Sequence, residues 1–325
     1  MVRSKRFDSV LITGANGFIG KALCKRMLAE NWRVRGAIRS THSKIVLPRG
    51  VEIFQIKSLG PYTDWSETLV DIDCVIHLAA RVHVINDTAT DSLSAFRWLN
   101  VKGTERLARM AARSGCRRFF FMSTVKVNGE ERPQAYTERD MPKPLGPYGI
   151  SKWEAEQVLH EIAKATGLEV TILRPSMVYG PGVKANFLRL VRSVARGVPL
   201  PLASVNNRRS LIYLENLVDA IITCIKHPRA AGQTYFVSDG EDVSTPELIR
   251  RISSALARPV RLFPFPPILL KISGIITGKS VVIDRLLRSL TIDCSKIRRE
   301  LDWQAPFSME QGLRETAKWY QKKED

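Results

Sequence analysis

Tyr148 and Lys152 lie four residues apart in the segment GPYGISKWEAEQ, which occupies residues 146–157. Gly146 and Pro147 are typical of a helix start, and the apolar residues that follow recur at helical spacing. Side chains at positions i and i+4 project from one side of a helix, so the lysine ammonium can lower the pKa of the phenol from its usual value of about 10. Such a pair would be a poised proton donor, although the same spacing also occurs in solvated pairs on surface helices.

The elements that must position this pair follow an alternating pattern. Short runs rich in β-branched and aromatic residues alternate with longer amphipathic stretches, which predicts βαβ units and a parallel sheet covered by helices on both faces. The fold class is therefore α/β, with a Rossmann-type doubly wound parallel sheet. The expected strands lie at residues 9–13, 32–39, 51–56, 74–80, 117–123 and 169–175.

The segment TGANGFIG follows the first expected strand and spaces its glycines as G-x-x-G-x-x-G. Gly14, Gly17 and Gly20 stand where the chain must turn sharply from strand to helix, with room for a pyrophosphate at the helix N-terminus. We therefore expect a bound dinucleotide, with Phe18 and Ile19 of the same turn among its contacts.

The length of 325 residues and the 44% content of hydrophobic residues allow a large core in two parts. We place the dinucleotide-binding domain at residues 1–175, completed by elements within 211–240. Residues 176–325 are expected to form mainly a smaller C-terminal substrate-binding lobe.

The end of the second expected strand bears on the choice of dinucleotide. NAD sites usually carry an acid there that holds the ribose 2′-hydroxyl, but Ile38 occupies this place and Arg39 follows it. A basic side chain suits a 2′-phosphate, so NADP(H) is favoured and NAD(H) is also compatible. The alternative is that Arg39 only faces solvent.

The net charge of +18 is unevenly distributed, because no acid occurs between Glu169 and Glu215 while seven arginines and lysines do. No helix-turn-helix, zinc-finger or aromatic RNA-binding motif is present, so nucleic acid is not the expected partner. A phosphate-bearing small molecule or an anionic membrane surface fits better, and a solvated basic face is the alternative.

Five scattered cysteines without a CxxC spacing indicate neither a disulfide framework nor a zinc site, so no metal is expected. The first residues carry no long apolar segment and no cleavage pattern. We expect a cytoplasmic protein, or one peripheral to the inner face of the membrane.

Seven segments in order resemble the extended short-chain dehydrogenase/reductases that act on nucleotide sugars: TGANGFIG, VIHLAA, NVKGTERL, FFFMSTVKVNG, PYGISK, LRPSMVYGPG and RSLIYLENLVDA. Tyr148 and Lys152 then look like the catalytic Tyr-x-x-x-Lys pair of that family. The segments VKVNGE, GPGVKANF, NRRSLIYLENLVD and FVSDGEDVSTPEL are similar to a narrower branch. Its members are reductases of UDP-4-keto-6-deoxy-N-acetylhexosamines that serve surface polysaccharide synthesis.

The resemblance implies roles for further residues. Thr124 resembles the catalytic hydroxyl that hydrogen-bonds the sugar oxygen, beside the proton donor Tyr148. The implied cofactor contacts, besides the glycine turn, Tyr148 and Lys152, are Arg39, Ala79, Ala80, Asn100, Ser123, Pro175 and Val178. The implied substrate contacts are Thr124, Lys126, Asn186 and Arg209, together with a further arginine that is either Arg285 or Arg288.

The resemblance leaves three hypotheses for function. The first is an NAD(P)H-dependent reductase of a UDP-4-keto-6-deoxy-N-acetylhexosamine, and the second is a UDP-hexose or UDP-N-acetylhexosamine 4-epimerase with retained NAD. The third is a non-enzymatic dinucleotide-binding protein. A 4,6-dehydratase is disfavoured because Val125 and Lys126 replace the Asp-Glu pair of such enzymes. A homodimer is the expected assembly.

Two further features invite functional interpretations. His77 lies in an apolar strand, where we expect a packed core histidine and not an acid-base group. The apolar stretch at residues 263–276 is too short to span a membrane and contains Lys271. It is expected to pack against or cover the substrate lobe, and a membrane-facing patch is the alternative.

Overall fold

The computed structural model describes residues 7–39, 47–82, 91–278 and 280–324. Seven strands form one sheet in the order β3-β2-β1-β4-β5-β6-β9, and every pair of neighbours is parallel. The strands are β1 (Ser9–Thr13), β2 (Arg33–Arg39), β3 (Glu52–Ile56), β4 (Cys74–His77), β5 (Arg118–Met122), β6 (Glu169–Pro175) and β9 (Thr234–Val237). The expected Rossmann-type sheet is therefore confirmed.

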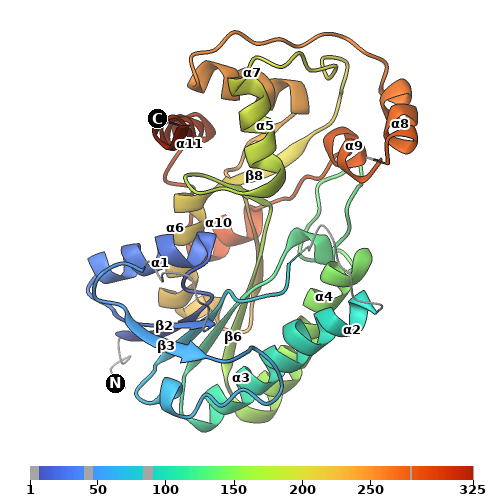
Figure 1. Cartoon of the computed structure of the whole chain (residues 1–325). Helices are drawn as coiled ribbons and strands as arrows, with labels where there is room; N and C mark the ends of the chain where they lie inside the picture. The colour runs from blue at the N-terminus through green and yellow to red at the C-terminus, as the bar shows by residue number, and fades with distance from the viewer. Residues whose placement is uncertain (1–6, 40–46, 83–90, 279, 325) are drawn as a thin grey trace.

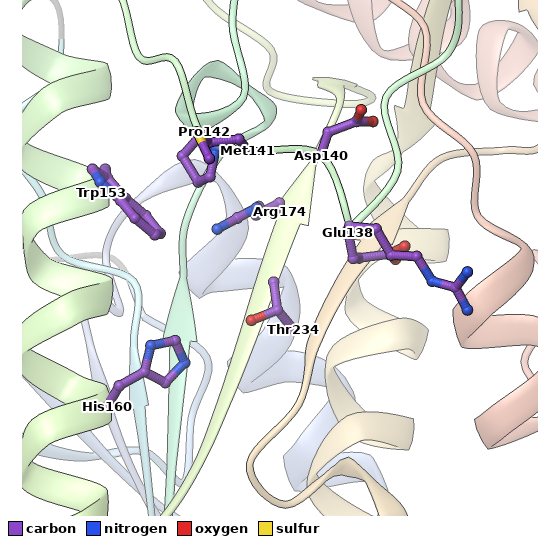
Figure 2. A pocket seen from close by; sticks show the side chains of 9 residues that line it. Glu138, Asp140, Met141, Pro142, Trp153, His160, Arg174 and Thr234 are labelled. Atoms are coloured by element: carbon purple, nitrogen blue, oxygen red, sulfur yellow. The ribbon is translucent and has the colours of Figure 1, made fainter.

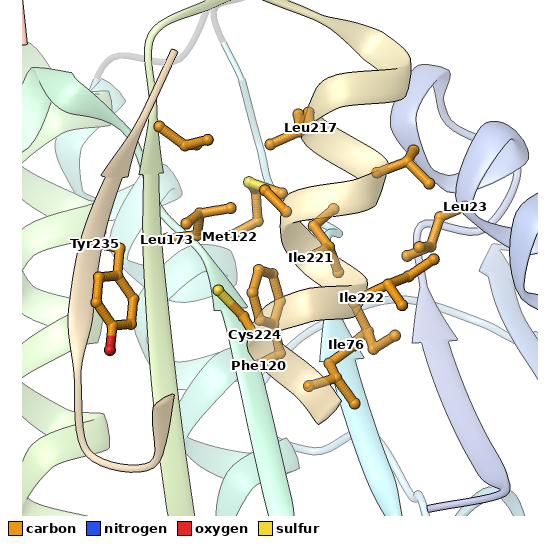
Figure 3. Close-up of a cluster of buried hydrophobic side chains, with 14 of the residues drawn as sticks. Leu23, Ile76, Phe120, Met122, Leu173, Leu217, Ile221, Ile222, Cys224 and Tyr235 are labelled. Atoms are coloured by element: carbon orange, nitrogen blue, oxygen red, sulfur yellow. The ribbon is translucent and has the colours of Figure 1, made fainter. Parts of the chain in front are cut away.

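Helices cover both faces of this sheet (Figure 1). One face carries α1 (Phe18–Ala29), α6 (Leu214–Lys226) and α10 (Ser295–Leu301), and the other carries α2 (Ser92–Arg97), α3 (Gly103–Arg113) and α4 (Gly146–Thr166). On the first face, Ile221 and Ile222 of α6 pack towards Ile76 and Phe120 of the sheet (Figure 3). β1, β4 and β5 are buried along their whole length, so their central residues form apolar runs that do not alternate with polar ones.

Local sequence signals set the ends of α4, the helix that carries the Tyr-Lys pair. It begins at Gly146 with Pro147 in its first turn, and it ends at Gly167, which adopts a left-handed φ of 76°. Four short turns complete the main body: η1 (Glu67–Leu69), the π-helical η2 (Trp98–Lys102), η3 (Val125–Val127) and η4 (Pro228–Ala230).

A second, smaller sheet has the order β10-β8-β7. Its strands are β7 (Met177–Tyr179), β8 (Arg209–Tyr213) and β10 (Asp242–Val243), and its helices are α5 (Ala185–Ala195), α7 (Thr245–Ala255), α8 (Pro267–Ile276), α9 (Ser280–Leu287) and α11 (Met309–Glu324). A separate apolar core, which includes Tyr179, Phe187 and Leu248, holds this lobe together. The proposed boundary at residue 175 falls between β6 and β7 and stays a prediction.

All five cysteines are buried free thiols. Within the described ranges, no helix is long and apolar enough to cross a membrane, and no cluster of metal-binding side chains occurs.

Candidate active site

Several predicted site residues follow strands that end at one edge of the seven-stranded sheet. Thr13 at the end of β1 pairs with His77 at the end of β4, and His77 pairs with Phe121 of β5. Ligands of open α/β sheets bind beyond this carboxyl edge, so the segments that follow these strands are placed to meet a common ligand. The predicted residues at or just beyond the strand ends are Gly14, Arg39, Ala79, Ala80, Ser123, Thr124 and Pro175.

The glycine turn has the geometry that a pyrophosphate needs. Gly14 has a φ of 70°, and a Cβ added to it would lie 3.0 Å from the backbone nitrogen of Ala79. The Gly17 amide donates to the carbonyl of Gly14 at 2.9 Å. Among the described residues, no side chain caps the start of α1, and its first turn contains no acid. The first amides of α1 and its positive dipole end therefore fit an anionic group.

The apolar residues of the predicted cofactor site lie near the junction of the two sheets. Phe18, Ile19 and Val178 are partly buried and pack against the core of the small lobe. A Cβ added to Gly182, in the loop after β7, would lie 3.5 Å from Cδ2 of Phe18. Pro175 ends β6 and is buried. The contacts of these residues with a nicotinamide stay predictions.

The end of β2 offers no carboxylate to a ribose. Ile38 is buried in the core, and Arg39 is exposed. The structure therefore agrees with the absence of the NAD-type acid, and no residue in the described ranges is seen to hold Arg39 towards a 2′-phosphate.

His77 is a structural residue. Its Nδ1 lies 2.7 Å from Oγ1 of Thr13, and its Nε2 lies 3.0 Å from Oγ1 of Thr104. Because the Thr104 hydroxyl donates to the carbonyl of Asn100 at 2.6 Å, we assign the proton of the ring to Nε2. Burial, with a smaller effect from the charge of Lys152, lowers the pKa of His77 to about 3. The ring is therefore neutral, as expected for a packed core histidine.

Asn100 joins the loop after β4 to helix α4. It lies in the π-helical turn η2, and its Oδ1 accepts from the amide of Arg81 at 2.8 Å. Its Nδ2 donates to the carbonyl of Arg81 and to Oγ of Ser151, both at 3.0 Å. The Ser151 hydroxyl donates to the carbonyl of Tyr148 at 2.9 Å. Asn100 therefore positions the first turn of α4, and its predicted cofactor contact stays a prediction.

Lys152 is only 2% exposed, and its Nζ lies 3.8 Å from the centre of the Phe121 ring. Burial lowers the pKa of Lys152 to about 7, and the negative charge of Glu156 opposes this decrease. Glu156 follows Lys152 by one helical turn, so Tyr148, Lys152 and Glu156 share one face of α4.

The expected decrease in the pKa of Tyr148 does not occur in the structure. Tyr148 is half-buried, and its ring packs edge-on against Phe96 with 6.3 Å between the ring centres. Burial raises the pKa of Tyr148 to about 12. The cost of removing the phenolate from water is therefore the main influence on this pKa.

Close packing brings the segment after β5 next to the start of α4. Thr124 precedes η3, and its Oγ1 lies 3.4 Å from the amide nitrogen of Lys126. A Cβ added to Gly149 would lie 3.0 Å from the Lys126 carbonyl oxygen, so a glycine beside Tyr148 permits this approach. The Lys126 ammonium donates to Oε1 of Glu130 at 2.6 Å. Gly149 was not among the predicted site residues, although it lies between Tyr148 and Lys152.

A buried ion pair that joins α4 to β6 was also missed. Glu156 accepts from the hydroxyl of Ser123 and from Nε of Arg174, the latter at 3.0 Å, and Nη2 of Arg174 bonds its second oxygen. The remaining guanidinium nitrogen of Arg174, Nη1, donates to Oδ1 of Asn128 at 2.9 Å. Arg174, which counted among the basic residues expected to face anions, is instead 4% exposed and paired. The feature of the sequence that could have drawn attention to Glu156 is its position four residues after Lys152, on the same face of the helix.

The structure distinguishes the two candidate arginines of the small lobe. Arg209 donates from Nη1 to the carbonyl of Arg285, and burial together with the charge of Arg285 lowers the pKa of Arg209. Arg288 instead pairs with Asp284 at 3.0 Å and with Glu131 at 3.3 Å. No described carboxylate lies within ion-pair distance of Arg285. Arg209 and Arg285 together are therefore the better candidates for the predicted diphosphate contact, since two adjacent cations gain most from a shared anion.

Two asparagines of the small lobe differ in their surroundings. Asn186 lies in the first turn of α5, a helix without a capping side chain or an acid at its start among the described residues, as a phosphate contact requires. Asn207 is buried and donates to the carbonyls of Leu286 and Arg288 at 3.1 and 3.0 Å. Asn207, which the sequence analysis did not identify, therefore anchors the end of α9.

A pocket of about 410 Å³ lies elsewhere, between α4 and the loop at residues 138–142 (Figure 2). Trp153 and His160 of α4 line one side, and Arg174 and Thr234 line the strand side. None of the predicted site residues lines this pocket, so its position is no evidence for the catalytic site.

Comparisons with known proteins agree with the fold and with the family resemblance. Residues 10–238 match the NAD dependent epimerase/dehydratase family. A Vibrio cholerae protein named UDP-glucose 4-epimerase is 42% identical over 313 residues, which cover 95% of this chain and 94% of that protein.

Solved structures give the same fold. UDP-glucose 4-epimerase from Thermotoga maritima with UDP-glucose has a TM-score of 0.78 at 22% identity, covering 98% of this chain and 100% of that chain. MoeE5 in complex with UDP-glucose and NAD has a TM-score of 0.76 at 25% identity, covering 98% of this chain and 100% of that chain.

Proposed function

The chain belongs to the NAD dependent epimerase/dehydratase family, and we propose that it is an NAD-dependent 4-epimerase of a UDP-hexose or UDP-N-acetylhexosamine. The observation that carries this proposal is the 42% identity, over 95% of the chain, with the UDP-glucose 4-epimerase of Vibrio cholerae. This finding favours the epimerase over the reductase expected from the shorter motifs.

The residues of the site can perform the proton transfers of such a reaction. The glycine turn would hold a dinucleotide, whose chemistry would be to accept a hydride from C4 of the sugar and to return it. Tyr148 takes the proton of the C4 hydroxyl when the ketone forms and gives it back when the alcohol is restored. Thr124 hydrogen-bonds the same oxygen, and the Lys152 ammonium stabilises the phenolate. The net reaction consumes no reduced cofactor, because each step is reversed on the other face of the ring.

We propose NAD as the cofactor. The preference for NADP(H) expected from Arg39 is not supported, and MoeE5, at 25% identity, was solved with NAD. Arg39, the positive residue at the end of β2, is exposed to solvent, so its charge does not require a phosphate partner. A homodimer remains the expected assembly.

The test supplies UDP-glucose and UDP-N-acetylglucosamine separately, without added cofactor, and identifies the products by NMR. We expect conversion to the 4-epimer and NAD in an extract of the denatured protein. The reductase hypothesis predicts no such conversion, but loss of NADPH or NADH absorbance with a UDP-4-keto-6-deoxy-N-acetylhexosamine. A protein that binds NAD but turns over neither kind of substrate would support the non-enzymatic hypothesis.

The diphosphate site gives a second prediction. Arg285→Met should raise KM for the nucleotide sugar by about 10–100-fold, because one charge-assisted phosphate contact is lost. Arg288→Met is the matched control and should change KM by less than about threefold, since Asp284 and Glu131 already neutralise Arg288. Steady-state kinetics of both variants check this, and a larger effect of Arg288→Met would reverse the assignment.

A further inference from the structure

Helix α8 turns apolar side chains towards solvent. Ile268, Ile275 and Ile276 are 68%, 72% and 79% exposed, and Leu269 and Ile272 are nearly half exposed. Single exposed apolar residues are common on protein surfaces, but five on one ten-residue helix form a patch that signals an interaction site. We call these five residues the α8 patch.

The packing of α8 explains why this face is left uncovered. The helix contacts α9 through Leu270 and Gly274, its two buried residues. A Cβ added to Gly274 would lie 2.8 Å from Cδ1 of Ile283, so the two helices lie very close together at this glycine. Figure 1 shows α8 at the outer edge of the small lobe, joined to α7 by a long extended segment. The expectation that this stretch packs on the lobe therefore holds for only one side of the helix.

Exposed positive charges occur on α8, at Lys271, and on the segment that leads to it, at Arg258 and Arg261. Arg258, Arg261 and Lys271 are exposed, and none has a carboxylate within ion-pair distance among the described residues. The sequence contains no acid from Leu248 to Ile283. The chain that carries the apolar helix thus bears cations that no described carboxylate neutralises, which disfavours a basic partner and favours an anionic one.

We propose that the α8 patch is a membrane-contact surface that binds an anionic bilayer from one side. A helix of ten residues is about 15 Å long, too short to span the hydrocarbon region but sufficient to lie in its interface with the isoleucines inserted. A stable protein partner usually covers about 20–30 residues on each side, far more than this patch offers. The surface lies on the lobe that carries Arg285 on α9, so a bound enzyme would hold its proposed diphosphate site near the membrane.

The test is co-sedimentation of the whole protein with two kinds of vesicle, phosphatidylcholine alone and phosphatidylcholine mixed with phosphatidylglycerol. Each lysine or arginine near an anionic surface is worth about fivefold in affinity, so the mixed vesicles should bind at least about tenfold more tightly. Binding should weaken as salt is added. The measurement does not use turnover and is therefore independent of the proposed activity.

The variant Ile275→Glu/Ile276→Glu should reduce binding at least about tenfold, because two apolar side chains can no longer be buried. The matched control is Tyr62→Glu/Val70→Glu, which charges two exposed apolar residues of the main body and should bind as wild type does. A third variant, Arg261→Glu/Lys271→Glu, should lose the preference for anionic vesicles while leaving the apolar residues intact. It also serves as the test if the isoleucine variant does not fold.

Three results would overturn the proposal. They are no binding to either vesicle, equal binding of wild type and both α8-region variants, and equal binding to neutral and anionic vesicles. A concentration-dependent dimer that the isoleucine variant loses, without vesicle binding, would show that the patch joins two copies of the chain instead.

Discussion

Tyr148→Phe is expected to lower turnover by about 10²–10⁴-fold, the usual contribution of a positioned acid-base group. The substitution removes only the phenolic hydroxyl and keeps the ring that packs edge-on against Phe96. Because the glycine turn and Asn100 are untouched, the amount of bound dinucleotide should stay nearly unchanged. Steady-state kinetics with the UDP-sugar, together with extraction of bound NAD, measure both quantities.

The matched control for this variant is Tyr62→Phe, which removes a hydroxyl from an exposed tyrosine between β3 and β4. It should retain wild-type turnover within about twofold. Turnover of Tyr148→Phe within a few fold of wild type would remove Tyr148 from the mechanism. A parallel loss of bound NAD would instead indicate a positioning role.

Glu156→Gln is expected to lower the free energy of unfolding by about 3–5 kcal/mol, the usual cost of leaving one member of a buried ion pair unpaired. Glu156 is fully buried and Arg174 is 4% exposed, so water cannot replace the lost carboxylate. Urea denaturation measures the change. The double variant Glu156→Gln/Arg174→Met removes both charges and should recover part of the loss.

The control is Glu310→Gln on α11, which breaks an exposed i,i+4 pair with Arg314 and should cost about 0.5 kcal/mol or less. An equal, small effect of both substitutions would show that the buried pair does not support α4.

Glu156→Gln also has an electrostatic readout that a purely structural residue would lack. The charge of Glu156 raises the pKa of Lys152, which burial lowers to about 7. Activity that needs the ammonium is lost as the pH rises through this pKa, so the corresponding limb of the kcat/KM profile should move to lower pH in the variant. An unchanged limb would contradict this coupling.

Features that depend on a few neighbouring residues could be predicted from the sequence alone. The glycine turn of residues 14–20 and the shared helix face of Tyr148 and Lys152 follow from local backbone geometry, as does the start of α4 at Gly146. The alternation of strands and helices then required a parallel sheet, because parallel strands need helical crossovers. The fold and the family could therefore be predicted before any tertiary contact was known.

Properties that depend on burial or on partners far away in the sequence became clear only in the folded structure. Arg285 and Arg288 are indistinguishable in the sequence, but the contacts of Arg288 with Glu131 and Asp284 separate them. The pKa of Tyr148 rises and does not fall, because the desolvation of a side chain depends on all the elements packed around it. The partner of Glu156 is likewise a long-range matter, since Arg174 reaches it from a neighbouring strand. The exposure of the α8 patch could be established only in the folded structure, because an apolar helix has the same sequence pattern whether its apolar face is covered or exposed.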